Sequence, residues 1–101
     1  MGCGRVGASL ATELDAAGHE VVVIDRDESA FARLPGWFTG RTVAGQGFDR
    51  DVLERAGLSG AGAFAAVSSG DNSNIIAARV ARETFGIDRV IARIYDAGRA
   101  E

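Results

Sequence analysis

The sequence predicts an α/β protein built on a doubly wound parallel sheet, and three observations carry that prediction. Short apolar runs alternate with helical patterns along the chain, and the connections between them are short. The clearest run, Val21-Val22-Val23-Ile24, is continuous and β-branched, as is typical of a strand covered on both faces of a parallel sheet. A glycine-rich segment, residues 2–7, stands at the point where such a sheet binds phosphate.

The glycine-rich segment reads Gly2-Cys3-Gly4-Arg5-Val6-Gly7 and has the spacing of a dinucleotide-binding loop. Glycine is needed there because the chain turns sharply, backbone N–H groups approach a pyrophosphate, and the following helix packs close to the sheet. The first turn of that helix also offers unpaired N–H groups and the positive end of the helix dipole. The segment therefore predicts a phosphate-binding site.

An acidic residue, Asp25, ends the next apolar run. A carboxylate about 20 residues beyond the loop is placed to bind ribose hydroxyls and to repel a 2′-phosphate. Asp25 therefore favours NAD or an adenosine nucleotide over NADP. Arg26 follows it and weakens that discrimination, because a guanidinium accommodates phosphate.

The first half of the chain shows clear start and stop signals. Leu10 and Leu14 lie on the apolar stripe of the first helix, and Gly18 is placed to end that helix. Asp27 is placed to cap a short second helix. Trp37 and Phe38 follow in a loop, where we expect both to pack against the sheet edge.

In the second half, Asp49 is placed to cap a helix, with Phe48 contacting Leu53 as a hydrophobic staple. Gly86 is placed to end the last helix. The predicted elements, in chain order, are helix 6–17, strand 21–24, helix 28–34, strand 41–44, helix 50–57, strand 63–67, helix 72–85 and strand 89–94.

Polar side chains and glycines follow every predicted strand. Because the carboxyl ends of parallel strands share one edge of the sheet, we expect these residues to converge on one ligand. Beyond Asp25 and the glycine-rich segment, they are Gly45, Gln46, Ser68, Ser69, Asp71, Asn74, Arg93 and Asp96.

Length and composition limit the possible functions. The 101 residues suffice for a single domain, 1–101, and no apolar run approaches the ~20 residues of a membrane span. The net charge is −3 and the arginines are scattered, which argues against a nucleic-acid surface. Lysine is absent, which excludes Schiff-base chemistry, and the single cysteine excludes an internal disulfide. We expect a cytoplasmic protein.

Few residues could act as catalysts. His19, the one histidine, lies in the turn before a strand, away from the expected ligand edge. Cys3 lies between two glycines, where a small residue is tolerated, and Tyr95 is expected to pack at the end of the sheet. One cysteine and one histidine cannot form a zinc site. We therefore expect no enzymatic activity.

The chain resembles the N-terminal nucleotide-binding domain of Trk potassium-uptake proteins, the TrkA-N, RCK or KTN domain, over essentially all of its residues. The segments that carry the resemblance are Gly2-Cys3-Gly4-Arg5-Val6-Gly7, residues 18–27, Asp49-Arg50-Asp51-Val52-Leu53, residues 66–74 and Val90-Ile91-Ala92-Arg93. The resemblance implies a Rossmann-like domain that binds NAD(H) or ATP/ADP and catalyses nothing. It also implies that the domain forms homo-oligomers and regulates the membrane subunit of a potassium channel or transporter from the cytoplasmic side.

The resemblance also assigns site residues. It implies that Gly2, Gly4, Arg5, Val6 and Gly7 hold phosphates and that Asp25 holds ribose with Arg26 beside it. Ser68 stands where threonine is usual, Asp71 and Asn74 match a polar helix start, and Arg93 matches an arginine that reaches toward phosphate. The chain departs from the family at Gln46, where aspartate is usual, and at Ala97, where proline is common.

The ends of the sequence depart from the family as well. The first strand of the family is represented only by Met1, and the last crossover helix and sixth strand are missing after Glu101. Because that first strand is central, we expect a gap in the sheet with unpaired N–H and C=O groups facing it. We therefore expect the sequence to be a fragment, or a mis-started reading frame, of a longer protein.

Two other functions stay open. One is a cofactor-binding fragment of an NAD-dependent dehydrogenase, against which the lack of catalytic residues argues. The other is a structural dimerisation domain that has lost its ligand. The intact glycines argue against that second reading, whereas Gln46 argues mildly for it.

Overall fold

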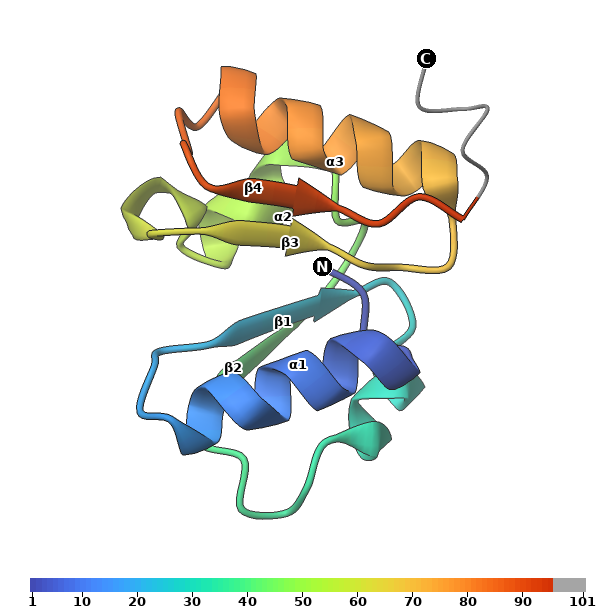
Figure 1. The fold of residues 1–101 in the computed structure, drawn as a ribbon, viewed down its shortest axis with the longest axis vertical. Coiled ribbons are helices and arrows are strands. Elements are labelled where there is room, and N and C mark those ends of the chain that lie inside the picture. The colour runs from blue at the N-terminus through green and yellow to red at the C-terminus, as the bar shows by residue number, and fades with distance from the viewer. Residues whose placement is uncertain (96–101) are drawn as a thin grey trace.

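The computed structural model describes residues 1–95 and has the predicted order of helices and strands (Figure 1). In chain order the elements are α1 (Arg5–Ala16), β1 (Val22–Asp25), the 3₁₀ helix η1 (Glu28–Arg33), β2 (Arg41–Ala44), α2 (Arg50–Arg55), the 3₁₀ helix η2 (Leu58–Gly60), β3 (Phe64–Ala66), α3 (Asp71–Glu83) and β4 (Val90–Ala92). The predicted α/β class is confirmed.

The strands form two parallel pairs. In the first pair, β1 runs beside β2 with Val22 opposite Arg41. In the second pair, β3 runs beside β4 with Phe64 opposite Val90. The carboxyl ends within each pair therefore lie at the same edge, as the sequence predicts.

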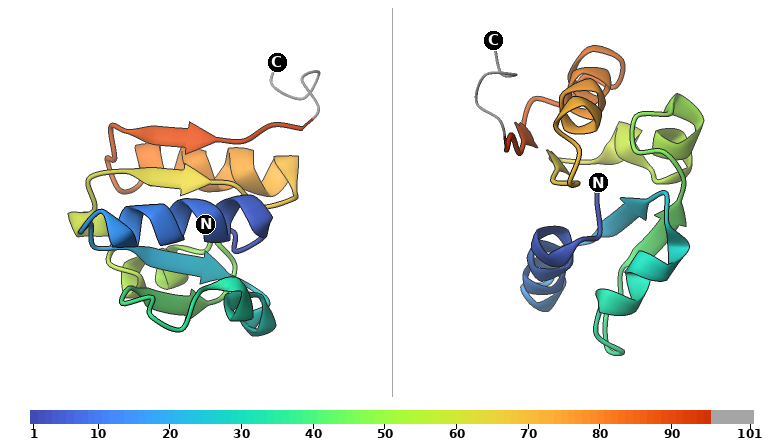
Figure 2. Two further views of the ribbon diagram at one scale, coloured as in Figure 1. Left: turned by 60° about the horizontal axis from the view of Figure 1, so that its bottom comes forward. Right: turned by 90° about the vertical axis from the view of Figure 1, so that its right-hand side faces the viewer.

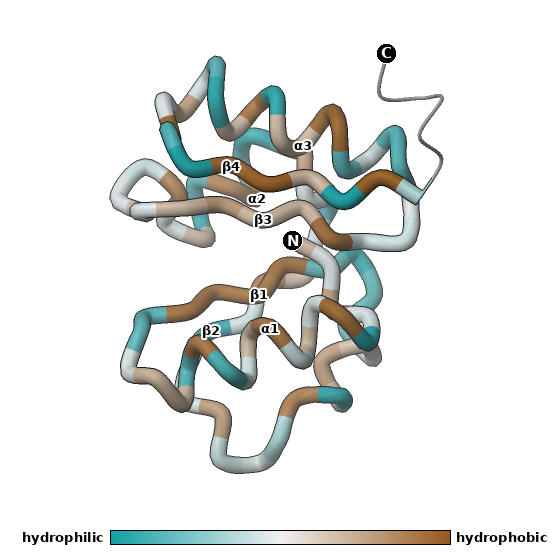
Figure 3. Tube along the Cα trace, in the orientation of Figure 1, coloured by the Kyte–Doolittle hydropathy of each residue, from teal (hydrophilic) through white to brown (hydrophobic). Residues whose placement is uncertain are grey.

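Helices cover opposite faces of the strands, as a doubly wound arrangement requires (Figure 2). Ala8 and Ala11 of α1 pack with Val23 of β1 and with η1, whereas Ile24 of β1 faces the larger core that includes α2 and α3. Small residues on α1 let this helix lie close to the strand. Figure 3 shows the hydrophobic residues concentrated along β1 and β4.

Met1 and Gly2 are the residues that join the two strand pairs. The Gly2 N–H donates to the carbonyl of Ile24 at 2.7 Å, and the Val67 N–H donates to the carbonyl of Met1 at 2.9 Å. The Met1 amino group donates to the carbonyl of Ala65 at 2.7 Å. Met1 thus pairs with β3 as a parallel strand would, and Gly2 continues that pairing onto β1.

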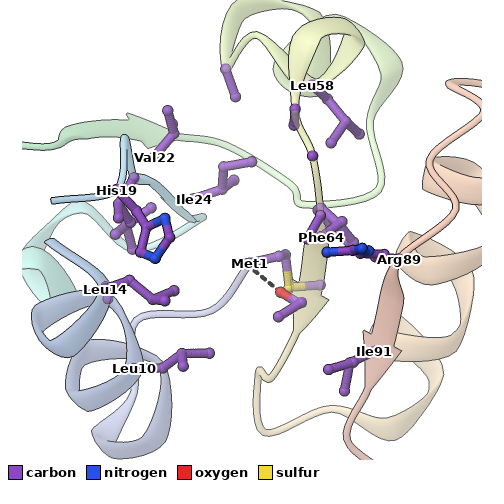
Figure 4. A pocket seen from close by; sticks show the side chains of 18 of the residues that line it. Met1, Leu10, Leu14, His19, Val22, Ile24, Leu58, Phe64, Arg89 and Ile91 are labelled. Atoms are coloured by element: carbon purple, nitrogen blue, oxygen red, sulfur yellow. Dashed lines mark hydrogen bonds between the residues drawn. The ribbon is translucent and has the colours of Figure 1, made fainter. Parts of the chain in front are cut away.

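The expected gap opens on the amino-terminal side of Met1. There, β1 and β3 are separated by a cavity of about 940 Å³ with a mostly apolar lining (Figure 4). Side chains that line it include Leu10, Leu14, Val22, Phe64 and Ile91. Within residues 1–95, the backbone bonds of Met1 and Gly2 join the two strand pairs at the carboxyl edge.

Three sequence-based expectations differ from the structure. Tyr95 was expected to pack at the end of the sheet, but 55% of its surface is exposed. Trp37 does not pack against the sheet, because 57% of its surface is exposed. A turn, in which the Phe38 N–H donates to the Pro35 carbonyl, directs Phe38 alone onto the core beneath α1. The helix capped by Asp27 is a short 3₁₀ helix, and Asp27 accepts from the Ser29 N–H as its cap. Asp96 and Ala97 lie outside the described residues.

The buried amino group of Met1 predicts a pH-dependent stability. Burial lowers its pKa from 8.0 to about 6, so between these values the unfolded chain binds more protons than the folded chain. For the 101-residue chain with a free amino group, the free energy of unfolding should therefore rise by about 2 kcal/mol from pH 6 to pH 8. Urea denaturation at several pH values measures this rise.

Candidate nucleotide site

The carboxyl edge of the strands brings the predicted residues together. Gly2 bonds to β1, as described above, and the Gly45 N–H donates to the Asp25 carbonyl at 3.0 Å. On the other strand pair, the Arg93 N–H donates to the Ala66 carbonyl at 2.9 Å, beside the loop that begins at Ser68. The segments that follow all four strands therefore meet at one edge, which is open to solvent.

The glycines of the loop at residues 2–7, hereafter the phosphate loop, serve different purposes. Gly2 has a φ of +101°, and a Cβ there would lie 2.6 Å from the backbone nitrogen of Ser68. A Cβ on Gly7 would collide with the carbonyl oxygen of Gly2. A Cβ on Gly4, in contrast, would meet no atom within 4 Å. Gly2 and Gly7 therefore permit the packing of the loop, while Gly4 leaves open space where a ligand can approach.

The start of α1 is suited to an anion. Gly4 is its N-cap and supplies no side-chain hydrogen bond, and the first turn holds no acidic residue. The first intrahelical bond of this turn runs from the Ala8 N–H to the Gly4 carbonyl. The N–H groups of the residues between them have no carbonyl partner inside the helix, so they and the helix dipole can bind phosphate oxygens.

Asp25 fixes the phosphate loop to the end of β1. Its Oδ2 accepts from the Cys3 N–H at 2.8 Å, and its Oδ1 accepts from the Asp27 N–H at 2.9 Å. Each oxygen retains capacity for another donor, such as a ribose hydroxyl. The sequence predicts that Asp25 binds the ligand, but it does not predict the hydrogen bond between Asp25 and Cys3. No local pattern indicates a contact between residues 22 positions apart.

Asn74 lies entirely inside the protein, and its amide is fully occupied. Its Oδ1 accepts from the N–H and the hydroxyl of Ser68, at 2.9 and 2.6 Å. Its Nδ2 donates to the carbonyls of Ser68 and Arg93, both at 2.9 Å. Every bonding position of the side chain is used. The amide therefore joins α3 to the loop after β3 and to the end of β4.

Arg93 and Tyr95, which follow β4, contact each other, and Tyr95 also contacts the start of α3. The Arg93 guanidinium lies 4.2 Å from the centre of the Tyr95 ring, a cation–π contact. The Tyr95 N–H donates to Oδ1 of the buried Asp71 at 2.8 Å. The loop at the end of β4 is thus held against the start of α3.

The structure gives Cys3 no activated thiol. The side chain is fully buried, and burial raises the pKa of the thiol, as does the neighbouring Asp25 carboxylate. The thiol is therefore protonated at neutral pH and a poor nucleophile. His19 is exposed and lies at the amino-terminal side of β1, away from this edge. Within residues 1–95, no group of three or more metal-ligating side chains comes together.

Burial divides the predicted site residues into those that can touch a ligand and those that support the site. Gly2, Gly7, Asp71 and Asn74 are buried. Those with exposed or half-buried surface are Gly4, Arg5, Val6, Asp25, Arg26, Gly45, Gln46, Ser68, Ser69 and Arg93.

Two hollows in the described part of the chain reach this edge only in part, one at Gly2 and Gly7 and the other at Arg5. The cavity between β1 and β3 reaches Gly2 and Gly7 but lies mainly on the amino-terminal side of Met1. A shallower hollow, of about 530 Å³, runs along α1 beside Arg33. The candidate site is therefore an open edge of the sheet. In residues 1–95, no helix has both the length and the apolarity to cross a membrane.

Comparison with known proteins agrees with this geometry. Residues 1–101 match the family model of the TrkA-N domain. A "Trk system potassium uptake protein TrkA" from Streptomyces coelicolor is 66% identical over the whole chain, which spans 45% of that protein. Proteins called "Trk system potassium uptake protein TrkA homolog" are 33% identical in Pyrococcus horikoshii and 34% identical in Methanothermobacter thermautotrophicus. The match to the Pyrococcus protein includes 98% of this chain and 43% of that protein. The match to the Methanothermobacter protein includes 100% of this chain and 46% of that protein.

The glycines of the phosphate loop predict a contrast in stability. Gly7→Ala should lower the free energy of unfolding by about 3 kcal/mol, because the new methyl group collides with the Gly2 carbonyl. Gly4→Ala should change it by less than about 1 kcal/mol, because the methyl group enters open space at an ordinary φ of −80°. Urea denaturation of both variants measures the contrast, and equal effects would contradict the packing described here.

Proposed function

The chain belongs to the TrkA-N family, and from that premise we propose that it is a regulatory, nucleotide-binding domain of a potassium-uptake system. Its ligand is NAD(H) or ATP/ADP, and it works without catalysis. The observation that carries the proposal is the open space over Gly4 at the start of α1, next to the Asp25 carboxylate.

The phosphates lie on the N–H groups of Arg5 and Val6, where the start of α1 carries no acidic side chain to repel them. The ribose hydroxyls donate to Asp25, which the Cys3 and Asp27 N–H groups already orient. Ser69 and Gln46 are exposed at the same edge and contact the remainder of the nucleotide. A 2′-phosphate is disfavoured beside the Asp25 carboxylate.

The regulatory role rests on the family and on the names of the relatives, which are potassium-uptake proteins. The chain spans less than half the length of these relatives, so the rest of the uptake system is supplied by other segments or subunits. Nucleotide binding acts by favouring one arrangement of paired copies of the domain, which then biases a membrane subunit from the cytoplasmic side. Such control needs a ligand that binds the two arrangements with different affinity.

We expect nucleotides to stabilise the folded chain against heat. A ligand that binds only the folded state at 100 times its Kd adds about 2.7 kcal/mol. NADH, NAD, ATP or ADP should therefore raise the melting temperature, and NADPH should not. Gly4→Val is the matched variant, because a Cβ at this position meets no protein atom within 4 Å and the branched side chain would occupy the space proposed for the phosphates. This variant should fold, and its melting temperature should not change with any nucleotide. If none of the five nucleotides raises the melting temperature of the wild-type chain, the proposed ligand is wrong.

The regulatory role has its own test. The matching segment of the Streptomyces coelicolor relative can be replaced by this chain, with which it is 66% identical. The graft should support potassium uptake by cells, and the same graft carrying Gly4→Val should lose nucleotide-dependent control of that uptake. If potassium uptake does not depend on nucleotide in either graft, the regulatory role is wrong and the domain is structural.

A further inference from the structure

We propose that Asn74 is the positioning residue of the nucleotide site, because its buried amide holds the Ser68 backbone against Gly2 of the phosphate loop. The proposal rests on the proposed nucleotide site and adds a residue that makes no ligand contact. Asn74 has no exposed surface, so it cannot reach a nucleotide itself.

In a first step, Asn74 holds Ser68 in place by hydrogen bonds. Three of the four hydrogen bonds of the Asn74 amide are made with Ser68. The Ser68 N–H and hydroxyl donate to Oδ1 of Asn74, and Nδ2 of Asn74 donates to the Ser68 carbonyl. Together they fix both peptide groups of Ser68 relative to α3. Few other arrangements of the loop satisfy all three bonds, and leaving any of these groups unpaired inside the protein is costly.

The second step leads from Ser68 to the phosphate loop. The Ser68 backbone packs so closely on Gly2 that a Cβ there would lie 2.6 Å from its nitrogen and 2.7 Å from its Cα. The Gly2 carbonyl in turn lies against Gly7, at the start of α1. A displacement of Ser68 is therefore passed to the backbone that faces the phosphates.

The fourth hydrogen bond ties the same amide to β4. The Asn74 Nδ2 donates to the carbonyl of Arg93, whose N–H bonds to β3. One side chain thus sets the distance between the end of β4, the loop after β3 and, through Ser68, the phosphate loop. These segments belong to both strand pairs, which the backbone bonds of Met1 and Gly2 also join.

Asn74→Asp tests the proposal, with Asn72→Asp as the matched control. The first change keeps the acceptors for Ser68 but sets a carboxylate against two carbonyl oxygens, whereas Asn72 is exposed on the same turn of α3. Isothermal titration of each folded chain with ADP and with NADH should show at least a tenfold loss of affinity for Asn74→Asp. Asn72→Asp should stay within about twofold of the wild type.

The pH dependence separates positioning from a general loss of structure. Burial beside two carbonyls should raise the pKa of the new carboxyl, so it becomes protonated as the pH falls and then donates one of the lost bonds. From about pH 7 to about pH 5.5, the affinity of Asn74→Asp relative to the wild type should recover several-fold. Circular dichroism at both pH values confirms that the folded fraction is unchanged.

The outcomes are distinct. If the wild type binds no nucleotide, the proposed function fails. If the wild type binds and folded Asn74→Asp binds equally well, the positioning role fails while the function stands. Asn74→Ala, which introduces no charge, is the second variant and should lose at least fivefold in affinity. If neither variant folds, Asn74 serves the fold as a whole and the proposal is overturned.

Discussion

The hydrogen bonds of Met1 and Gly2 are the constraint on which the rest of the structure depends. They are the place where the pair β1–β2 is joined to the pair β3–β4 by strand pairing. Each pair has helices to cover it, and Ile24 of β1 packs into the core of the second pair. Apolar packing brings the two halves together without fixing their register, since it is non-directional. The backbone bonds at Met1 and Gly2 supply that register.

The same two residues run directly into the phosphate loop, so the sheet and the candidate site share one support. Gly2 bonds to β1, touches Ser68 and lies against Gly7. No side chain larger than hydrogen fits among these contacts. Asp25 adds a further restraint, because its carboxylate holds the Cys3 N–H in the centre of the loop. The loop is therefore shaped before any ligand arrives, which reduces the entropy lost on binding.

Much of the fold follows from local sequence patterns. Asp27 and Asp49 cap the helices that they were predicted to cap, and the run ending at Asp25 is a strand beside the one at Arg41. Contacts between distant segments were not predictable in this way. The bonds of Asp25 to Cys3 and of Asn74 to Arg93 depend on how the elements pack, and so does the exposure of Trp37. For the candidate site, the sequence predicts which segments meet at one edge, and the structure separates the residues that face solvent from those that are buried.

The position of the site between the two strand pairs has a consequence for how a ligand would act. Phosphates bound at α1 would contact the first half, whereas Ser69 and Arg93 belong to the second half. A ligand that touches both halves favours the arrangement in which they are joined, by an amount equal to its difference in affinity for the joined and separated arrangements. A nucleotide at the carboxyl edge would therefore act on the same junction that Met1 and Gly2 hold by backbone hydrogen bonds.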